Sequence, residues 1–330
     1  MSDPSCASRG ELRLLSPSGA VPQPERVQRA ADNLRALGFQ VRVDARALAR
    51  QQRFAGSDAQ RVQALHLAAR SRARVVMATR GGYGLTRLLD RIDHALLHDA
   101  IQRRGQLWVG HSDFTALQLA LLALHGSVTC SGPMASFDFG GERVDAITRE
   151  SFLDVVDGRL EAVGFACPDA PRGLDAAGPL WGGNLSLVCS LVGTPYLPQV
   201  QGVLFLEDVG EHPYRIERMF SQLLGAGVLQ RQRAVLLGSF TEYRLVEHDA
   251  GYDLDAAVGW LRRQLREHGV PVLEGLPFGH VRTKLSLPHG AQCRLVRDGS
   301  EAYLVFGHSH HGHHAPAADS AAASHVHEAH

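Results

Sequence analysis

Ser112 lies between a segment typical of a buried strand and a segment typical of a helix, in the run QLWVGHSDFTALQLALLALHG (106–126). A serine hydroxyl at such a turn can face a cleft while the amides at the helix start stabilise negative charge beside it. This is the setting of a serine nucleophile, although Ser and Asp are also common helix N-caps. The hydrolase pattern GxSxG is half present, because Gly110 precedes the serine by two residues and Phe114 follows it by two. An ordinary α/β-hydrolase turn is therefore not expected.

A serine nucleophile needs a base, and the base needs a carboxylate that fixes its tautomer. His280 is the best candidate base, because Pro277 and Gly279 place it in a tight turn between strand-like runs. Glu207 is the candidate carboxylate, since it ends the apolar run GVLFLED (202–208) and an unpaired charge inside the core would be costly. Two alternatives stay open: Glu207 capping the next helix, and His280 bonding its own turn.

The oxyanion of such a reaction needs two fixed hydrogen-bond donors. The residue after a turn nucleophile usually supplies one, so the Asp113 amide is expected first, and the Asp113 side chain is expected to cap the helix. RGGYG (80–84) is expected to supply the other through Gly81 or Gly82, because glycine lets backbone amides approach a ligand closely. A plain tight turn is the alternative. A dinucleotide site is not indicated, since Arg87 stands where the third glycine of that fingerprint would fall.

The composition favours a small-molecule partner. The 330 residues are 45% hydrophobic and 21% charged, which suits two ordinary domains, and 34 basic residues balance 34 acidic ones. Without net charge, neither nucleic acid nor an anionic membrane is an expected partner. The five cysteines lack metal or redox spacing and are expected to be reduced. The chain has neither a signal-peptide pattern nor a membrane span, so a cytoplasmic location is expected.

Strand-like and helical patterns alternate over residues 1–145, which predicts an α/β domain with a parallel sheet. Ser57 followed by Gln60 predicts a capping box at the start of one of its helices. Residues 146–178 contain Pro and Gly and are weakly periodic, so they are expected to form a linker.

Residues 179–307 predict a second, mixed α+β domain with an antiparallel hairpin that turns at Asp298 and Gly299. Residues 308–330 hold eight of the eighteen histidines among small residues that cannot form a core. This stretch is expected to be a disordered tail that binds metal at most weakly, since its histidines lack the spacing of a defined metal site.

Six motifs occur in one order along the chain: RGGYG (80–84), GHSDFTAL (110–117), SGPM (131–134), WGGNLS (181–186), LFLEDVGEHPYRIERM (204–219) and LPFGHVRTKLSLPHG (276–290). Together they resemble the LD-carboxypeptidase family, the muramoyltetrapeptide carboxypeptidases. The resemblance runs from about Leu12 to Phe306. Because so many motifs keep their order, the set is far more specific than any one of them.

The resemblance implies a catalytic triad of Ser112, Glu207 and His280. It also implies a Rossmann-like N-terminal domain, a smaller β-rich C-terminal domain, a site between the two, and a homodimer. The implied reaction is hydrolysis of the L,D amide bond that releases terminal D-alanine from murein tetrapeptide in cell-wall recycling, with no cofactor and no metal. Ser131 departs from the family pattern, in which histidine is expected.

Four further residues are expected to contact the substrate. Asn184 is similar to a substrate-contacting position of the family, and Tyr83 lies in RGGYG. Trp181 is expected to form an apolar wall, and Arg215 is expected to pair with a substrate carboxylate. The alternatives are buried packing for Trp181 and Asn184 and a helical ion pair with Glu211 for Arg215.

Two other functions stay open. Some relatives resemble microcin C immunity proteins, which keep the triad and cleave acyl-sulfamoyl adenylates. An adenine site calls for aromatic stacking, which the 6% aromatic content does not favour. The second alternative is a non-catalytic binding module in which the histidine-rich tail binds metal.

Overall fold

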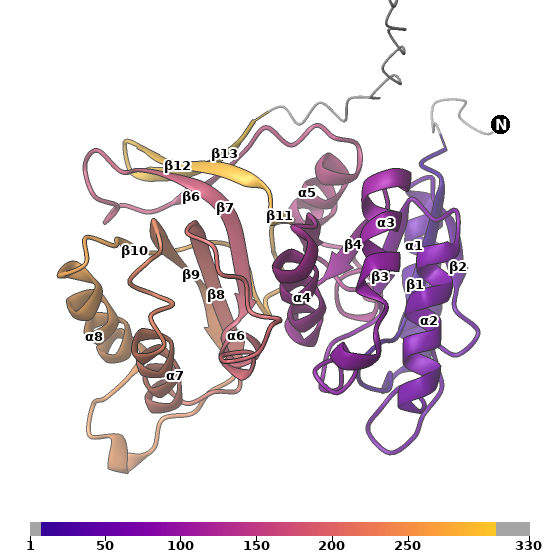
Figure 1. Ribbon diagram of the computed structural model, residues 1–330, viewed down its shortest axis with the longest axis horizontal. Coiled ribbons are helices and arrows are strands. Elements are labelled where there is room, and N and C mark those ends of the chain that lie inside the picture. The colour runs from indigo at the N-terminus through magenta and orange to yellow at the C-terminus, as the bar shows by residue number, and fades with distance from the viewer. Residues whose placement is uncertain (1–7, 308–330) are drawn as a thin grey trace, which may run out of the picture.

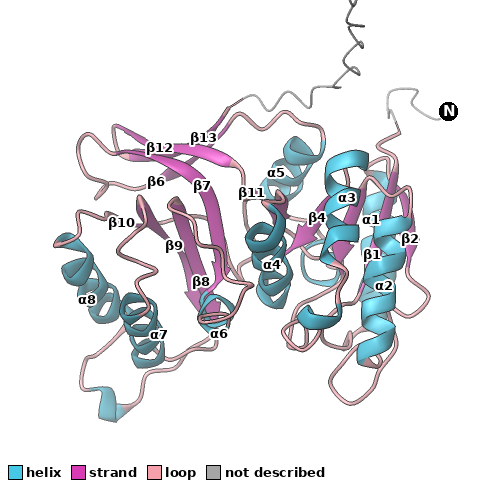
Figure 2. Ribbon diagram, in the orientation of Figure 1, coloured by secondary structure: helices cyan, strands magenta, loops and turns pink. Residues whose placement is uncertain are grey.

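Two sheets lie side by side in the computed structural model, which describes residues 8–307, and helices pack against both sheets (Figure 1, Figure 2). The expected disordered tail, 308–330, and Cys6 lie outside the described residues. Among the helices of residues 8–307, none is both long enough and apolar enough to cross a membrane.

The first sheet comes mainly from the first half of the chain. Its strands are β1 (Glu11–Leu15), β2 (Gln40–Val43), β3 (Val75–Ala78), β4 (Leu107–Gly110), β5 (Thr129–Ser131) and β11 (Leu287–His289). The order across the sheet is β11-β5-β4-β3-β1-β2. Strands β1 to β5 are parallel, which confirms the parallel α/β architecture expected for this half.

Helices cover both faces of this sheet. They are α1 (Pro24–Ala36), α2 (Asp58–Arg70), α3 (His94–Arg104), α4 (Thr115–His125) and α5 (Ala146–Val156). Apolar residues of α1 and α5 share one core with the strands, while α2, α3 and α4 pack into another. Ser57 and Gln60 form the predicted capping box at the start of α2.

The second sheet is part parallel and part antiparallel. Its strands are β6 (Ala162–Ala166), β7 (Asp175–Asn184), β8 (Val203–Val209), β9 (Ala234–Thr241), β10 (Val272–Glu274), β12 (Gln292–Asp298) and β13 (Glu301–Phe306), in the order β10-β9-β8-β7-β12-β13-β6. The four strands from β10 to β7 are parallel, and the rest pair antiparallel, including the predicted β12–β13 hairpin. The helices of this half are α6 (Leu185–Ser190), α7 (Pro213–Gly225) and α8 (Leu254–Arg266).

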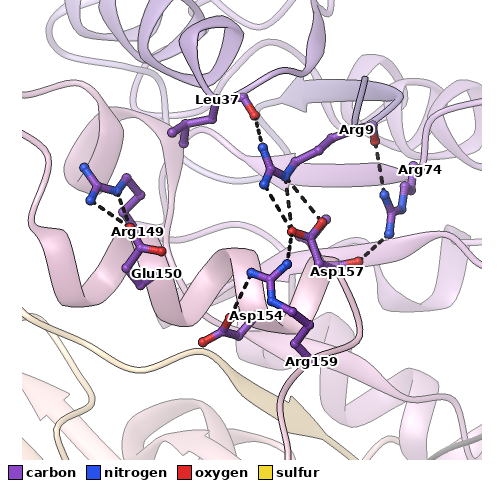
Figure 3. A network of polar contacts seen from close by, with 9 residues as sticks. Arg9, Leu37, Arg74, Arg149, Glu150, Asp154, Asp157 and Arg159 are labelled. Atoms are coloured by element: carbon purple, nitrogen blue, oxygen red, sulfur yellow. Dashed lines mark hydrogen bonds and ion pairs between the residues drawn. The ribbon is translucent and has the colours of Figure 1, made fainter. Parts of the chain in front are cut away.

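Residues 146–178, expected to be a linker, contain α5, β6 and the first residues of β7, which corrects that expectation. Strand β6 lies at the edge of the second sheet, and its residues alternate between exposed and buried, so its apolar signal is short and weak. Figure 3 shows polar contacts at the end of α5, where Asp157 accepts hydrogen bonds from Arg9 at 3.2 Å and from Arg159 at 2.6 Å. The passage between the two sheets is therefore continuous folded structure.

The chain returns to the first sheet near its end, which the assignment of residues 179–307 to one separate domain did not anticipate. Strand β11 pairs antiparallel with β5, with Leu287 opposite Ser131. Residues just before β11 also bond to α5, where the Lys284 amide donates to Thr148 Oγ1 at 2.9 Å. The shorter elements are 3₁₀ turns at Leu89–Arg91, Ser112–Phe114 and Glu247–Asp249 and a π-helical turn at Ala135–Phe139.

Candidate active site

Ser112 lies directly beyond the carboxyl end of β4, in the short 3₁₀ turn that leads into α4. Its φ angle is +61°, a left-handed value that is uncommon for a residue with a side chain and that often marks functional sites. The residue at the N-cap of α4 is Phe114, and no side chain caps that helix. The N-cap interpretation of Ser112 is therefore wrong, and the turn is a strained strand-to-helix junction.

Two glycines allow this turn to pack closely. A Cβ atom added to Gly81 would lie 2.7 Å from Ser112 Oγ, and one added to Gly110 would lie 2.8 Å from the ring of Phe114. Such distances are too short for real Cβ contacts, so a side chain at either position would push the turn apart. The half-matched GxSxG pattern has a physical explanation here, because the Phe114 ring fills the space beside Gly110.

Of the two glycines expected at the oxyanion site, Gly81 is the one against the nucleophile. Its added Cβ would also lie 3.2 Å from the Asp113 amide nitrogen. Gly82 instead faces the Arg80 guanidinium and Gly19. The first amides of a helical segment have no acceptor inside the helix, which leaves the Asp113 amide suited to an oxyanion.

The Asp113 side chain anchors the glycine-rich loop and does not cap α4, contrary to expectation. It is buried, and its Oδ2 accepts a hydrogen bond from the Leu85 amide at 2.9 Å. Burial raises the pKa of this carboxyl group, while the amide hydrogen bonds that it accepts act in the opposite direction. Asp113 thus fixes the loop of residues 80–85 against the turn that carries Ser112.

Glu207 and His280 form the expected carboxylate–imidazole pair. Glu207 lies near the end of β8 and is fully buried, and its Oε2 lies 2.8 Å from His280 Nδ1. Because a carboxylate only accepts, Nδ1 carries the proton and Nε2 is left as the basic nitrogen. Burial disfavours the charged imidazole, but the hydrogen bond and negative charge of Glu207 outweigh it and raise the pKa of His280 above 6.5.

The two alternatives for this pair are wrong. His212 is the N-cap of α7, the helix that follows β8, so Glu207 does not cap it. His280 makes its side-chain hydrogen bond with Glu207, 73 positions away in the sequence, and not with its own turn.

Asn184 supports the carboxylates and is not placed to contact a substrate, since it is only 4% exposed. Its Nδ2 donates to Glu207 Oε1 at 3.3 Å and to Asp208 Oδ1 at 2.8 Å. Asp208 also accepts from Ser186 Oγ at 2.6 Å. Burial, together with the charge of Glu207, raises the pKa of Asp208. Parallel pairing places Asn184 directly opposite Glu207, a cross-strand relationship that sequence spacing does not reveal.

His111 belongs to this site and was missed by the sequence analysis, although it is adjacent to Ser112 in GHSD. It is buried, and its Nδ1 donates to the Gly132 carbonyl at 2.8 Å. Burial and the charge of Lys284 hold the pKa of His111 well below its usual range. Its ring centroid lies 5.2 Å from that of His280, at 73°. Ser112 Oγ has no hydrogen-bond partner within residues 8–307, so no hydrogen bond fixes the direction of its hydroxyl.

The other residues expected to contact the substrate make their contacts away from Glu207 and His280. Trp181 is fully buried and donates from Nε1 to Gln232 Oε1 at 3.0 Å, so its assignment as an apolar wall is wrong and it belongs to the core. Arg215 is exposed and lies 3.7 Å from Glu211, which precedes the N-cap of α7. Tyr83 is 43% exposed, and its ring lies 5.9 Å from that of Phe54.

The described part of the chain shows neither a cluster of metal ligands nor an exposed cysteine. Residues 8–307 contain no group of three or more His, Cys, Asp or Glu side chains that could hold a metal ion. Four cysteines in this range, Cys130, Cys167, Cys189 and Cys293, are free and buried. Burial raises the pKa of Cys130 and Cys293 to about 12, so both are neutral thiols near pH 7.

Comparison with known proteins gives consistent matches over both halves. Models of the LD-carboxypeptidase N-terminal domain and C-terminal domain match residues 12–132 and 177–295. A probable murein peptide carboxypeptidase of Bacillus subtilis is 30% identical over 313 residues, which are 92% of this chain and 94% of that protein. The solved muramoyltetrapeptide carboxypeptidase of Oxalobacter formigenes is 39% identical, with a TM-score of 0.81, over 90% of this chain and 98% of that one.

A solved microcin C7 self-immunity protein has a similar structure, with a TM-score of 0.78 over 92% of this chain and 97% of that one. Its sequence is 22% identical, so this likeness extends to the fold alone.

Proposed function

The chain belongs to the LD-carboxypeptidase family, and from this membership we propose that it is a serine carboxypeptidase that releases terminal D-alanine from murein tetrapeptide. The bond cleaved is the L,D amide, and the role is in cell-wall recycling. The observation that carries the proposal is the 2.8 Å contact between Glu207 and His280, beside the strained turn of Ser112. It supplies a base of fixed tautomer, whose ring centroid lies 5.2 Å from that of His111, the residue before Ser112.

In the proposed mechanism His280 Nε2 takes the proton of Ser112 as Oγ attacks the carbonyl carbon of the scissile amide. Glu207 holds the imidazole in place and stabilises the imidazolium that forms. His280 then gives its proton to the departing amine of D-alanine, which leaves an acyl-enzyme on Ser112. Water activated by His280 attacks this ester and regenerates the free serine.

We assign the oxyanion donors to the backbone amides of Asp113 and Gly81. Gly81 packs against Ser112 Oγ and the Asp113 amide nitrogen, as the distances from an added Gly81 Cβ indicate. Backbone donors that are fixed before the reaction stabilise the developing charge without reorganisation. His111 contributes a neutral imidazole at this point, so it adds no positive charge that would oppose protonation of His280.

A cellular location and an oligomeric state are proposed as well. A cytoplasmic location suits the free, buried thiols, because cysteines stay reduced in that compartment. A homodimer is proposed from family membership. The microcin-type reaction is less favoured, since burial of Trp181 removes one aromatic residue that could stack on a base.

The test is digestion of murein tetrapeptide by the wild type and by Ser112→Ala, followed by mass spectrometry for tripeptide and D-alanine. Loss of the nucleophile is expected to lower kcat by at least about a thousandfold. Ser190→Ala is the matched control, because Ser190 is exposed on α6. Near-normal release of D-alanine by Ser112→Ala would refute the proposal. Cleavage of an acyl-sulfamoyl adenosine with no action on tetrapeptide would favour the microcin-type reaction.

A further inference from the structure

Arg80 is a half-buried cation with no carboxylate partner in the described part of the chain. It follows β3 and opens the loop of residues 80–85. Its guanidinium makes one side-chain hydrogen bond there, from Nη1 to the Ala20 carbonyl at 2.8 Å. Four of its five N–H donors are therefore available to a ligand.

The surroundings of Arg80 add positive charge and supply no acid. Burial and the charge of Arg53 both lower the pKa of Arg80. The carboxylate of Asp58 pairs with Arg61 and with Arg87, the latter at 3.0 Å, and not with Arg80. A partly desolvated guanidinium without a counter-charge is costly, and an anion that binds there would relieve that cost.

Two consecutive glycines link the surroundings of Ser112 to those of Arg80. An added Cβ on Gly81 would touch Ser112 Oγ at 2.7 Å, and an added Cβ on Gly82 would lie 3.5 Å from Arg80 Nη2. Neighbouring Cα atoms are about 3.8 Å apart. In a peptide substrate, the scissile carbonyl carbon and the terminal carboxylate carbon are likewise separated by one residue. Consecutive residues of this loop thus pack against Ser112 and against Arg80, and the two substrate groups are likewise one residue apart.

We infer that Arg80 binds the terminal carboxylate of the substrate and so makes the protein an exopeptidase, an inference that rests on the proposed function. The planar guanidinium can hold a carboxylate through two parallel hydrogen bonds. Arg53 strengthens the site by its charge. Arg215, the arginine expected in this role from the sequence, already faces Glu211 on the surface of α7.

Binding of the terminal carboxylate by Arg80 predicts selectivity for a free carboxyl terminus. A tetrapeptide that ends in D-alanine and the same peptide ending in D-alaninamide differ only in the group that Arg80 would bind. For the wild type, kcat/KM is expected to be about 100-fold higher for the carboxylate, as charged hydrogen bonds of this kind are worth. Arg80→Met should lose about 100-fold on the carboxylate peptide and little on the amide, which brings the ratio close to one.

The experiment compares both peptides with the wild type, Arg80→Met and Arg80→Lys, with Arg87→Met and Arg215→Met alongside. Arg80→Lys should restore part of the selectivity, because it keeps the charge but not the planar fork. Arg87→Met is the matched control, since that arginine pairs with Asp58, and it should keep the full ratio.

Equal losses on both peptides in Arg80→Met would overturn the inference and give Arg80 a purely structural role. Collapse of the ratio in Arg215→Met, or a wild type that does not distinguish the peptides, would overturn it as well. A wild type that cleaves neither peptide would instead refute the proposed function.

Discussion

Lys284 and Asp138 form an ion pair in which both side chains are buried, with exposed fractions of 0% and 1%. Asp138 lies in the π-helical turn after β5, and Lys284 lies four residues after His280. The pair therefore fixes the segment that carries His280 to the half of the chain that carries Ser112. Pairing of β11 with β5 acts in the same direction. His280 reaches Glu207 of the second sheet from a segment that is anchored on the first.

Glu207→Gln is expected to lower kcat by about 10³–10⁴-fold and to move the pH profile. His280 acts as a base only when neutral, so kcat/KM falls as the pH drops through its pKa. Glu207 raises that pKa above that of an ordinary histidine, so the acidic limb of the wild type lies at a higher pH than an unperturbed histidine would give. Without the carboxylate, burial dominates and the limb moves to lower pH. The measurement is kcat/KM against pH, with Glu211→Gln as control; an unmoved limb would contradict the assigned pairing.

Lys284→Met is expected to move the same limb in the opposite direction. Glu207 and Asp208 raise the pKa of His280 and Lys284 lowers it, while the charge of Asp138 also interacts with that of His280. Removal of the ammonium should raise the pKa, so activity is lost at a higher pH than in the wild type. The single variant leaves Asp138 buried and unpaired, so its free energy of unfolding should fall by about 3–5 kcal/mol.

The double variant Asp138→Asn/Lys284→Met separates the two effects, because it removes both charges and should recover most of that stability. Thermal unfolding and pH profiles of the two variants provide the comparison. If the acidic limb of the kcat/KM profile lies at the wild-type pH in both variants, the ion pair only supports packing.

Gly81→Ala is expected to reduce kcat strongly while the protein stays folded. The added methyl group would lie 2.7 Å from Ser112 Oγ, so either the serine or the loop must move, and a displacement of about 1 Å can cost about 100-fold in rate. Gly225→Ala is the matched control, since nothing lies within 4 Å of a Cβ added at that helix end. Steady-state kinetics with circular dichroism of both variants test this, and full activity in Gly81→Ala would contradict the close packing.

Asn184→Ala is expected to lower kcat and leave KM nearly unchanged. Asn184 donates to Glu207 and Asp208 inside the core, so its loss leaves two buried carboxylates short of a donor. The free energy of unfolding should fall by about 1–3 kcal/mol. A substrate-contacting asparagine would instead raise KM. Measurement of kcat, KM and urea unfolding for this variant distinguishes the two roles, and a raised KM with unchanged stability would favour substrate contact.

Local signals in the sequence predicted local features well. The alternation of strands and helices in the first half, the capping box of Ser57 and Gln60, and the β12–β13 hairpin each depend on neighbouring residues, and each is present. The same holds for the position of Ser112 after β4, because a buried strand followed by a helix can be read from hydrophobic periodicity.

Features that depend on distant contacts were missed or misassigned. Trp181 was expected to form an apolar wall beside the substrate and is in the core, and Asn184 was expected at the substrate and bonds to carboxylates. Strand β11 has only three residues, too few to carry a periodic signal, and its partner β5 lies more than 150 positions earlier. The uncompensated charge of Arg80 likewise appears only when the pairing of its neighbours is known.

The sequence by itself determined the candidate nucleophile, base and carboxylate and the family, because these follow from residue types, spacing and motif order. Only the tertiary structure decided that Gly81 and not Gly82 faces Ser112, that the ring of His111 lies beside that of His280, and that His280 is anchored to the first sheet. The physical reason is that burial, side-chain direction and charge pairing are set by which strands become neighbours. That choice minimises exposed apolar area and unpaired charge over the whole chain.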